Sequence, residues 1–161
     1  MKQIVSWLSV VLLSIFLLVS TEAIAAPNFS LKTEEGKTVS LADYKGQPLV
    51  LHFWATWCPY CKKLQPGLNA LYEKYQPQGL KMLAVSIWED EGATPQAVLN
   101  KRGYGFKTVI NGDDITKMFN VKGTPTTVFI NRAGEVVWRT DKSDPKNPKL
   151  EKAILDILKK A

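Results

Sequence analysis

Two cysteines three positions apart are the residues of this chain best suited to redox chemistry. Cys58 and Cys61 stand in the stretch WATWCPYCKKL, and the 161 residues contain no other cysteine. Thiol–disulfide exchange needs one thiolate that attacks and a second thiol that resolves the mixed disulfide. If a helix begins just after Trp57, Cys58 lies at its N-terminus, where unpaired N–H groups and the helix dipole favour a thiolate. Pro59 suits the first turn of such a helix.

Structural and metal-binding roles fit this cysteine pair less well. A disulfide that closes so short a loop contributes little stability, because the stabilisation in the chain-entropy model grows with loop length. A zinc site needs four ligands, and the chain offers no second cysteine pair and a single histidine, His52. We therefore expect no metal and no cofactor. A non-catalytic copper carrier or binding module stays open as the alternative from a different class.

The hydrophobic pattern predicts one α/β domain that presents the cysteine pair at the end of a buried strand. Residues 49–54 form a nearly continuous apolar run, which is typical of a strand covered on both faces. A helix with a kink at Pro66 should follow, because apolar residues recur at helical spacing from Leu64 to Tyr75. The other expected elements are a hairpin over 27–47 that includes Leu41, strands over 80–87, 107–110, 126–130 and 135–139, and helices over 94–103 with Thr94 as N-cap, 113–119 and 150–160. This order predicts a mixed sheet with helices on both faces.

The first 25 residues predict a secretory signal peptide. Lys2 precedes the apolar run 4–19, and Ala23-Ile24-Ala25 supplies the small residues of a cleavage site after Ala25. The run is shorter than the about 20 residues that a membrane span needs, although its retention as a membrane tether stays open. We expect the domain to cover 26–161 and to work in a periplasmic or otherwise extracytoplasmic compartment, where disulfides persist.

The charge of the chain excludes one class of partner. Its 21 Lys and Arg against 15 Asp and Glu give a formal net charge of +6. The basic residues are spread along the sequence, which is typical of lysines that keep a domain soluble. Because no run of them approaches a nucleic-acid patch, we expect no nucleic-acid partner.

Motifs beyond the cysteine pair make the chain resemble the thioredoxin superfamily, and within it the exported TlpA/ResA/DsbE-like reductases. The stretch LVLHFWATWCxxC at 49–61 resembles the family's active-site strand and helix start. Residues 36–48 resemble the extra N-terminal hairpin of that branch, VKGTPTT at 121–127 its cis-proline loop, and FINRAGEVV at 129–137 its closing hairpin. The resemblance covers residues 27–160. It implies a thioredoxin-like mixed central sheet flanked by helices, with an extra N-terminal β-hairpin.

The resemblance also implies an activity, that of an exported protein thiol:disulfide oxidoreductase. It favours a reductase of protein disulfides, with cytochrome c maturation as a candidate process, in which Cys58 exchanges with the substrate and Cys61 resolves. The implied partners are disulfide-containing protein substrates and a membrane electron donor of the thiol–disulfide type. A disulfide-forming oxidant is the alternative within the same chemistry, because small shifts in thiolate stability move the reduction potential over a wide range. A peroxidase would need an upstream cysteine, which the chain lacks.

Five residues are expected on the substrate side of the site. In the resemblance, Thr124 and Pro125 form a cis-proline turn that packs against the cysteine pair and leaves a backbone edge for a substrate peptide. A trans proline that merely starts a strand is the alternative. Trp57, Pro59 and Tyr60 border the pair and are expected to shape the docking surface.

Two further residues have a candidate catalytic role and a plain structural alternative. His52 stands where many thioredoxins carry a buried Asp, and its usual pKa near 6.5 suits it to accept a proton from Cys61. The alternative is a hydrogen-bonded strand residue, because apolar burial disfavours the charged imidazole. Glu89 resembles an acidic residue that several exported reductases hold near the cysteines, where it would raise the thiol pKa. Otherwise it is simply part of the acidic loop 89–91.

Overall fold

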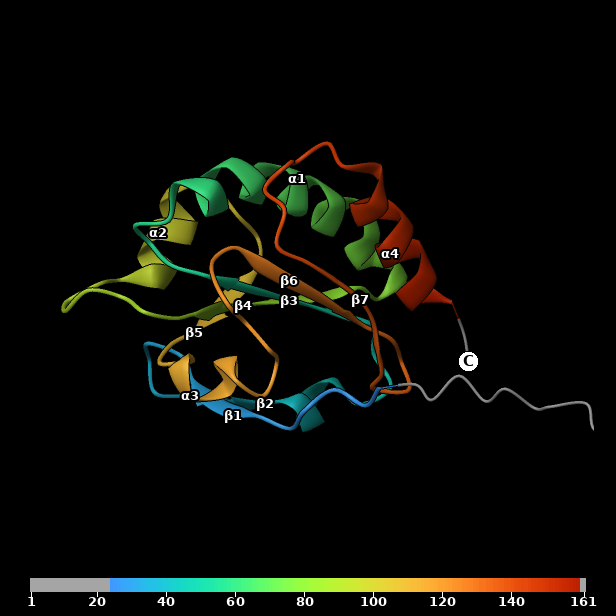
Figure 1. Cartoon of the computed structure of the whole chain (residues 1–161), viewed down its shortest axis with the longest axis horizontal. Helices are drawn as coiled ribbons and strands as arrows, with labels where there is room; N and C mark the ends of the chain where they lie inside the picture. The colour runs from blue at the N-terminus through green and yellow to red at the C-terminus, as the bar shows by residue number, and fades with distance from the viewer. Residues whose placement is uncertain (1–23, 160–161) are drawn as a thin grey trace, which may run out of the picture.

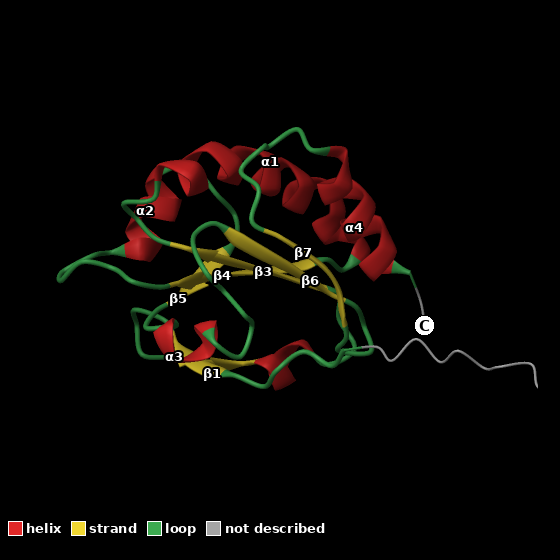
Figure 2. Cartoon of the chain, in the orientation of Figure 1, coloured by secondary structure: helices red, strands yellow, loops and turns green. Residues whose placement is uncertain are grey.

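The computed structural model describes residues 24–159 and has a five-stranded mixed sheet at its centre (Figures 1 and 2). The strand order is β5-β4-β3-β6-β7, with β4 parallel to β3 and β5, and β6 antiparallel to β3 and β7. A separate two-stranded sheet joins β1 and β2. The predicted mixed sheet, flanking helices and N-terminal hairpin are confirmed. The elements in chain order are β1 (Ser30–Lys32), β2 (Thr38–Ser40), η2 (Leu41–Tyr44), β3 (Leu49–Trp54), α1 (Pro59–Tyr75), η3 (Gln76–Gln78), β4 (Lys81–Ser86), α2 (Pro95–Lys101), β5 (Lys107–Val109), α3 (Asp113–Thr116), β6 (Thr126–Ile130), β7 (Val136–Thr140) and α4 (Pro148–Leu158).

The central sheet is covered on both faces. The helices α1, α2 and α4 lie over one face, and α3 lies with the β1–β2 hairpin over the other (Figure 1). Side chains of β3 alternate between the two layers: Val50 and Trp54 pack with the α1 side, whereas Leu51 and Phe53 pack on the opposite side. All six residues of β3 are buried. This two-sided burial is the reason for the continuous apolar run in the sequence.

Helix α1 begins a short turn after β3, the strand that leads to the cysteines. Cys58 is its N-cap and Pro59 occupies the first turn, where a missing backbone N–H costs nothing. The helix runs without a break through Pro66 to Tyr75 and buries one face against the sheet. It ends at η3, which is closed by Gly79 in the left-handed conformation at φ 94°.

Two local predictions differ in detail from the structure. Leu41 belongs to η2 and not to a strand, because Asp43 accepts hydrogen bonds from the Ser40 backbone and hydroxyl and turns the chain. Thr94 is the N-cap residue of α2, as predicted, but its side chain makes no cap hydrogen bond. The Gln96 N–H that such a cap would accept donates to the Glu34 carboxylate at 2.7 Å, from the turn of the hairpin.

The first described residues pair with the start of β7. Ala26 N–H donates to the Gly134 carbonyl and Val136 N–H to the Ile24 carbonyl, both at 2.8 Å. The predicted cleavage point after Ala25 therefore falls inside this pairing, while the rest of the predicted signal peptide lies outside the described residues. Between residues 24 and 159, no helix is long and apolar enough to cross a membrane.

Candidate active site

The structure joins Cys58 and Cys61 in a disulfide at the N-terminus of α1. Cys58 is 2% exposed and Cys61 is fully buried. The backbone N–H of Cys61 donates to Sγ of Cys58 at 3.0 Å, so the sulfur is the helix cap. A hydrogen-bond donor and the positive end of the helix dipole both stabilise a thiolate at Cys58 in the reduced protein. The expected position of the pair at a helix start is confirmed.

The Thr124–Pro125 peptide bond is cis, as the motif predicts. Strand β6 begins at the next residue and pairs with β3, with Thr126 opposite Phe53. Pro125 is therefore positioned beside the end of β3, from which the chain continues to Cys58. The Thr126 hydroxyl fixes the loop by donating to the Gly123 carbonyl at 2.8 Å. Pro125 is buried and Thr124 is half-buried.

Exposed aromatic side chains surround the disulfide. Trp57 is 51% exposed and Tyr60 is 62% exposed, and Pro59 between them is exposed as well. The Trp57 indole N–H donates to the Trp88 carbonyl at 2.8 Å, which fixes one ring against the loop after β4. These three residues have the exposure that a docking surface requires, and their part in docking stays a prediction.

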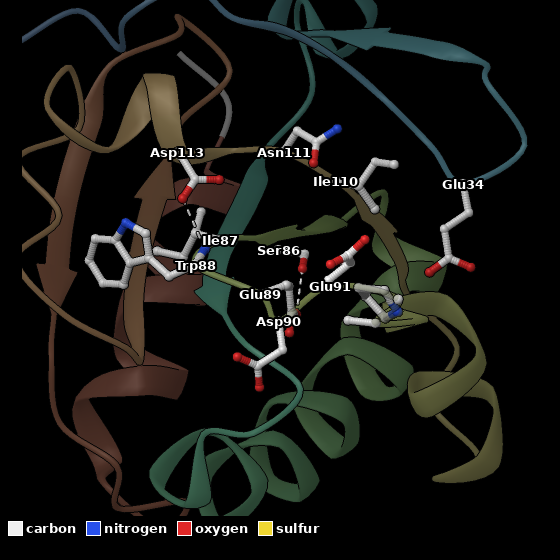
Figure 3. A pocket seen from close by; sticks show the side chains of 13 residues that line it. Glu34, Ser86, Ile87, Trp88, Glu89, Asp90, Glu91, Ile110, Asn111 and Asp113 are labelled. Carbon is white, nitrogen blue, oxygen red and sulfur yellow. Dashed lines mark hydrogen bonds between the residues drawn. The ribbon is translucent and has the colours of Figure 1, made fainter.

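Trp88 is a rim residue that the sequence interpretation missed. It is 40% exposed and has a left-handed backbone at φ 54°, which is strained for a bulky residue. Its N–H donates to Oδ1 of Asp113 at 3.0 Å (Figure 3). Its carbonyl accepts from the Trp57 indole N–H. Because these partners come from the start of α3 and from the segment before α1, no local sequence signal could have placed Trp88 at the site.

Glu89 binds the segment that leads into the cysteine pair. Its two carboxylate oxygens accept from the Thr56 N–H at 2.9 and 3.0 Å and from the Thr56 hydroxyl at 2.6 Å. The Ser86 hydroxyl donates to the same carboxylate at 2.6 Å (Figure 3). The carboxylate therefore ties the end of β4 to a residue two positions before Cys58. We call this set of hydrogen bonds between Glu89, Thr56 and Ser86 the clamp. It attaches a carboxylate to the segment that leads into Cys58.

An acidic pocket of about 330 Å³ adjoins this clamp (Figure 3). No Lys or Arg lines it, although the whole chain is basic. Among the described residues, no group of three or more His, Cys, Asp or Glu is arranged to hold a metal ion. The carboxylates that line the pocket are Glu34, Glu89, Asp90, Glu91 and Asp113.

His52 is fully buried in the middle of β3. Its Nδ1 lies 3.2 Å from the Thr127 hydroxyl, and its Nε2 lies 3.4 Å from the side-chain amide nitrogen of Gln65. Burial lowers the pKa of the imidazole to about 3, so the ring is neutral at physiological pH. These surroundings favour the interpretation of His52 as a hydrogen-bonded structural residue over that of a proton acceptor for Cys61.

A cysteine pair that starts a helix, together with a cis-proline that immediately precedes the neighbouring strand, defines a protein of the thioredoxin-like class. The chain matches the AhpC/TSA family over residues 24–139, and it belongs to that family. It is 35% identical over 113 residues to the thiol-disulfide oxidoreductase ResA of Halalkalibacterium halodurans, and 36% identical over 118 residues to the ResA of Bacillus subtilis. These alignments cover 70% and 73% of this chain but only 64% and 65% of the relatives, so the chain spans less than two thirds of their length.

Solved structures give the same fold. A putative thiol:disulfide interchange protein DsbE from Chlorobium tepidum superposes with a TM-score of 0.73 at 29% identity, over 85% of this chain and 97% of the other. A putative thioredoxin from Neisseria meningitidis superposes with a TM-score of 0.71 at 28% identity, over 84% and 91% of the two chains. The predicted resemblance to the thioredoxin superfamily and its ResA- and DsbE-like branch is confirmed.

The burial of His52 predicts a pH-dependent stability. Its pKa is about 3 in the folded protein against a usual value of 6.5, so below pH 6.5 only the unfolded chain takes up a proton there. Unfolding therefore becomes easier as the pH falls through this window. Between pH 7 and pH 5, we expect the unfolding free energy of the wild type to drop by about 2 kcal/mol more than that of His52→Asn. Urea unfolding at both pH values measures this difference, and parallel pH dependences would refute the shift.

The clamp predicts two effects of Glu89→Gln. An amide cannot accept from every donor that meets the carboxylate, so we expect a loss of about 1–3 kcal/mol in unfolding free energy. Removal of the negative charge should also lower the pKa of the Cys58 thiol in the reduced protein. Ultraviolet absorbance of the thiolate, followed against pH, measures that pKa. The exposed Glu91→Gln variant is the matched control, and an equal response of both variants would contradict the role of Glu89.

Proposed function

We propose that the protein is a protein thiol:disulfide oxidoreductase that works as a reductase through Cys58 and Cys61. The observation that carries the exchange chemistry is the hydrogen bond from the Cys61 N–H to Sγ of Cys58 at the start of α1. The direction of electron flow rests on the resemblance to exported reductases. The hydrogen bond supports a low-pKa thiolate at the less buried of the two cysteines, which is what an attacking thiol needs. The names of the ResA relatives and of the DsbE neighbour support the same chemistry.

The reaction proceeds by two exchanges. The Cys58 thiolate attacks one sulfur of a substrate disulfide, which forms a mixed disulfide and releases the other substrate sulfur as a thiolate. The Cys61 thiol, once deprotonated, attacks Sγ of Cys58 and releases the second substrate thiolate. Two electrons pass to the substrate, whose sulfurs take up protons, and the protein is left with the Cys58–Cys61 disulfide. A dithiol donor must then reduce this disulfide, and we assign that task to a membrane protein.

The surface around the disulfide suits an extended polypeptide substrate. We assign the substrate edge to the backbone at Thr124, because Pro125 immediately precedes β6, which pairs with the active-site strand β3. Trp57, Tyr60 and Trp88 supply exposed aromatic area on the same rim. Apolar contact with unfolded or flexible segments of disulfide-containing proteins is what such side chains provide.

We assign the reaction to an extracytoplasmic compartment. The positive start, the apolar run 4–19 and the small residues before position 26 support export, with the same segment as the candidate membrane tether. Cytochrome c maturation is the process that the resemblance to TlpA/ResA/DsbE-like reductases suggests. A disulfide-forming oxidant would use the same residues with a higher potential.

The reduction potential of the Cys58–Cys61 pair separates these two functions. Equilibration of the protein with a glutathione or dithiothreitol buffer, followed by alkylation of free thiols, measures it. A value near that of thioredoxin, about −270 mV, is expected for the reductase. A value near that of DsbA, about −120 mV, would replace the proposed function by that of an oxidant. An absence of insulin reduction by the reduced protein would favour a non-catalytic carrier.

The two cysteines should respond differently to substitution. We expect Cys61→Ser to accumulate a mixed disulfide between Cys58 and the substrate, because the resolving thiol is missing. Cys58→Ser should trap nothing. Non-reducing electrophoresis after incubation with insulin distinguishes these species. Adduct formation by Cys58→Ser but not by Cys61→Ser would reverse the assigned roles, and equal adduct formation by both variants would contradict them.

Pro125→Ala tests the substrate edge. We expect the catalytic efficiency kcat/KM for insulin reduction to fall at least about tenfold, which corresponds to about 1.4 kcal/mol of lost transition-state binding. The midpoint of urea unfolding should stay close to that of the wild type, so that the loss of activity is not a loss of folded protein. The control is Pro148→Ala at the start of α4, far along the chain from the site. Unchanged turnover in Pro125→Ala would refute the role of Pro125 in substrate binding.

A further inference from the structure

A chain of hydrogen bonds crosses the core from the surface to the strand that follows the cis-proline. Arg102, at the C-terminus of α2, donates from Nη1 to Oε1 of Gln65 in α1. The Gln65 amide nitrogen lies 3.4 Å from Nε2 of His52, and Nδ1 of His52 lies 3.2 Å from the Thr127 hydroxyl. Gln65, His52 and Thr127 are fully buried. Four elements therefore meet in one polar chain.

Arg102 determines which atom donates and which accepts in each hydrogen bond of this four-residue network. A guanidinium has donors only, so the oxygen of Gln65 must face it and the amide nitrogen must face His52. The amide nitrogen also has donors only, so Nε2 of His52 accepts and carries no proton. The proton of the neutral imidazole then resides on Nδ1, which donates to the Thr127 hydroxyl. A single tautomer of His52 satisfies all three bonds.

Arg102, at the surface end of the hydrogen-bond network, is itself held in place. The Arg102 guanidinium carbon lies 5.8 Å from the ring centroid of Trp54, a cation–π contact. The Trp54 indole N–H donates to the Thr108 hydroxyl at 3.2 Å, which orients that ring. Arg102 is therefore fixed from two sides, by Gln65 and by Trp54.

The buried residues of the hydrogen-bond network belong to the same helix and strands as the redox site. Gln65 follows Cys61 by four residues in α1, so both occupy the same face of the helix. His52 and Thr127 are directly opposite each other in the β3–β6 pair, and Thr127 follows Pro125 by two residues. The polar chain thus connects the helix that holds the cysteines to the strand that holds the cis-proline turn.

We infer that Arg102, Gln65, His52 and Thr127 form a positioning relay, in which Arg102 fixes His52 as the Nδ1–H tautomer and the imidazole locks the β6 register of the Pro125 turn against α1. None of the four is a catalytic residue. A break at any link leaves a buried donor or acceptor unpaired, which makes the relay an all-or-none unit. The effect on exchange rests on the proposed function, whereas the tautomer and the hydrogen bonds do not.

Nitrogen NMR of the His52 ring tests the relay without any activity assay. We expect a neutral ring with its proton on Nδ1 in the wild type and in the control Glu91→Gln. Gln65→Glu keeps a partner for Arg102 but presents an acceptor to Nε2, so a proton should appear on Nε2. An Nε2–H tautomer in the wild type, or an unchanged ring in Gln65→Glu, would overturn the inference.

Insulin kinetics test the positioning role. Thr127→Val removes the partner of His52 at nearly constant volume, and we expect KM to rise about tenfold with kcat changed less than about twofold. Thr127→Ser should restore KM because it keeps the hydroxyl. The matched control is Thr140→Val, a buried residue that pairs with Thr127 in the sheet but donates nothing to the relay. Equal KM values for Thr127→Val and Thr140→Val would overturn the positioning role. If the wild type reduced no insulin, the proposed function would fail while the NMR test still decided the tautomer.

Discussion

The site depends on the capping of α1 by a sulfur atom. Helix N-termini leave backbone N–H groups without partners, and most proteins satisfy them with an oxygen side chain. Here Sγ of Cys58 accepts from the Cys61 N–H, so the residue that starts the helix is also the candidate nucleophile. A short turn from β3, buried on both faces, delivers Cys58 to that position. The buried strand thereby fixes the position of the Cys58 thiol.

Polar side chains from distant segments hold the loops around this cap. Glu89 collects donors from Thr56 and Ser86, and Asp113 accepts from the N–H of Trp88. On the other side of β3, the His52–Thr127 bond ties β6 to the same strand. Charge-assisted and buried hydrogen bonds are the strong ones, because few waters compete for them. The active-site loops are therefore defined by polar contacts, while the apolar layers define the sheet.

His52 and Glu89 differ in how they can act on their surroundings: the first is neutral, and the second brings a carboxylate. His52 is neutral at physiological pH because burial depresses the pKa of the imidazole, so it places no charge in the core beside β6 and α1. Glu89 brings a carboxylate to the segment before Cys58, and the acidic pocket extends beyond it.

The sequence by itself determined the redox pair, the strand 49–54, the start of α1 and the cis-proline turn, because each is written in a local pattern of residue types. The order of the predicted strands and helices, together with the family motifs, was enough for the mixed sheet and the N-terminal hairpin. Only the tertiary structure decided which carboxylate caps α2, that Trp88 joins the rim, and that His52 is neutral with Gln65 and Thr127 as partners. These features join residues that are far apart along the chain, and burial and hydrogen-bond direction exist only after the layers have packed.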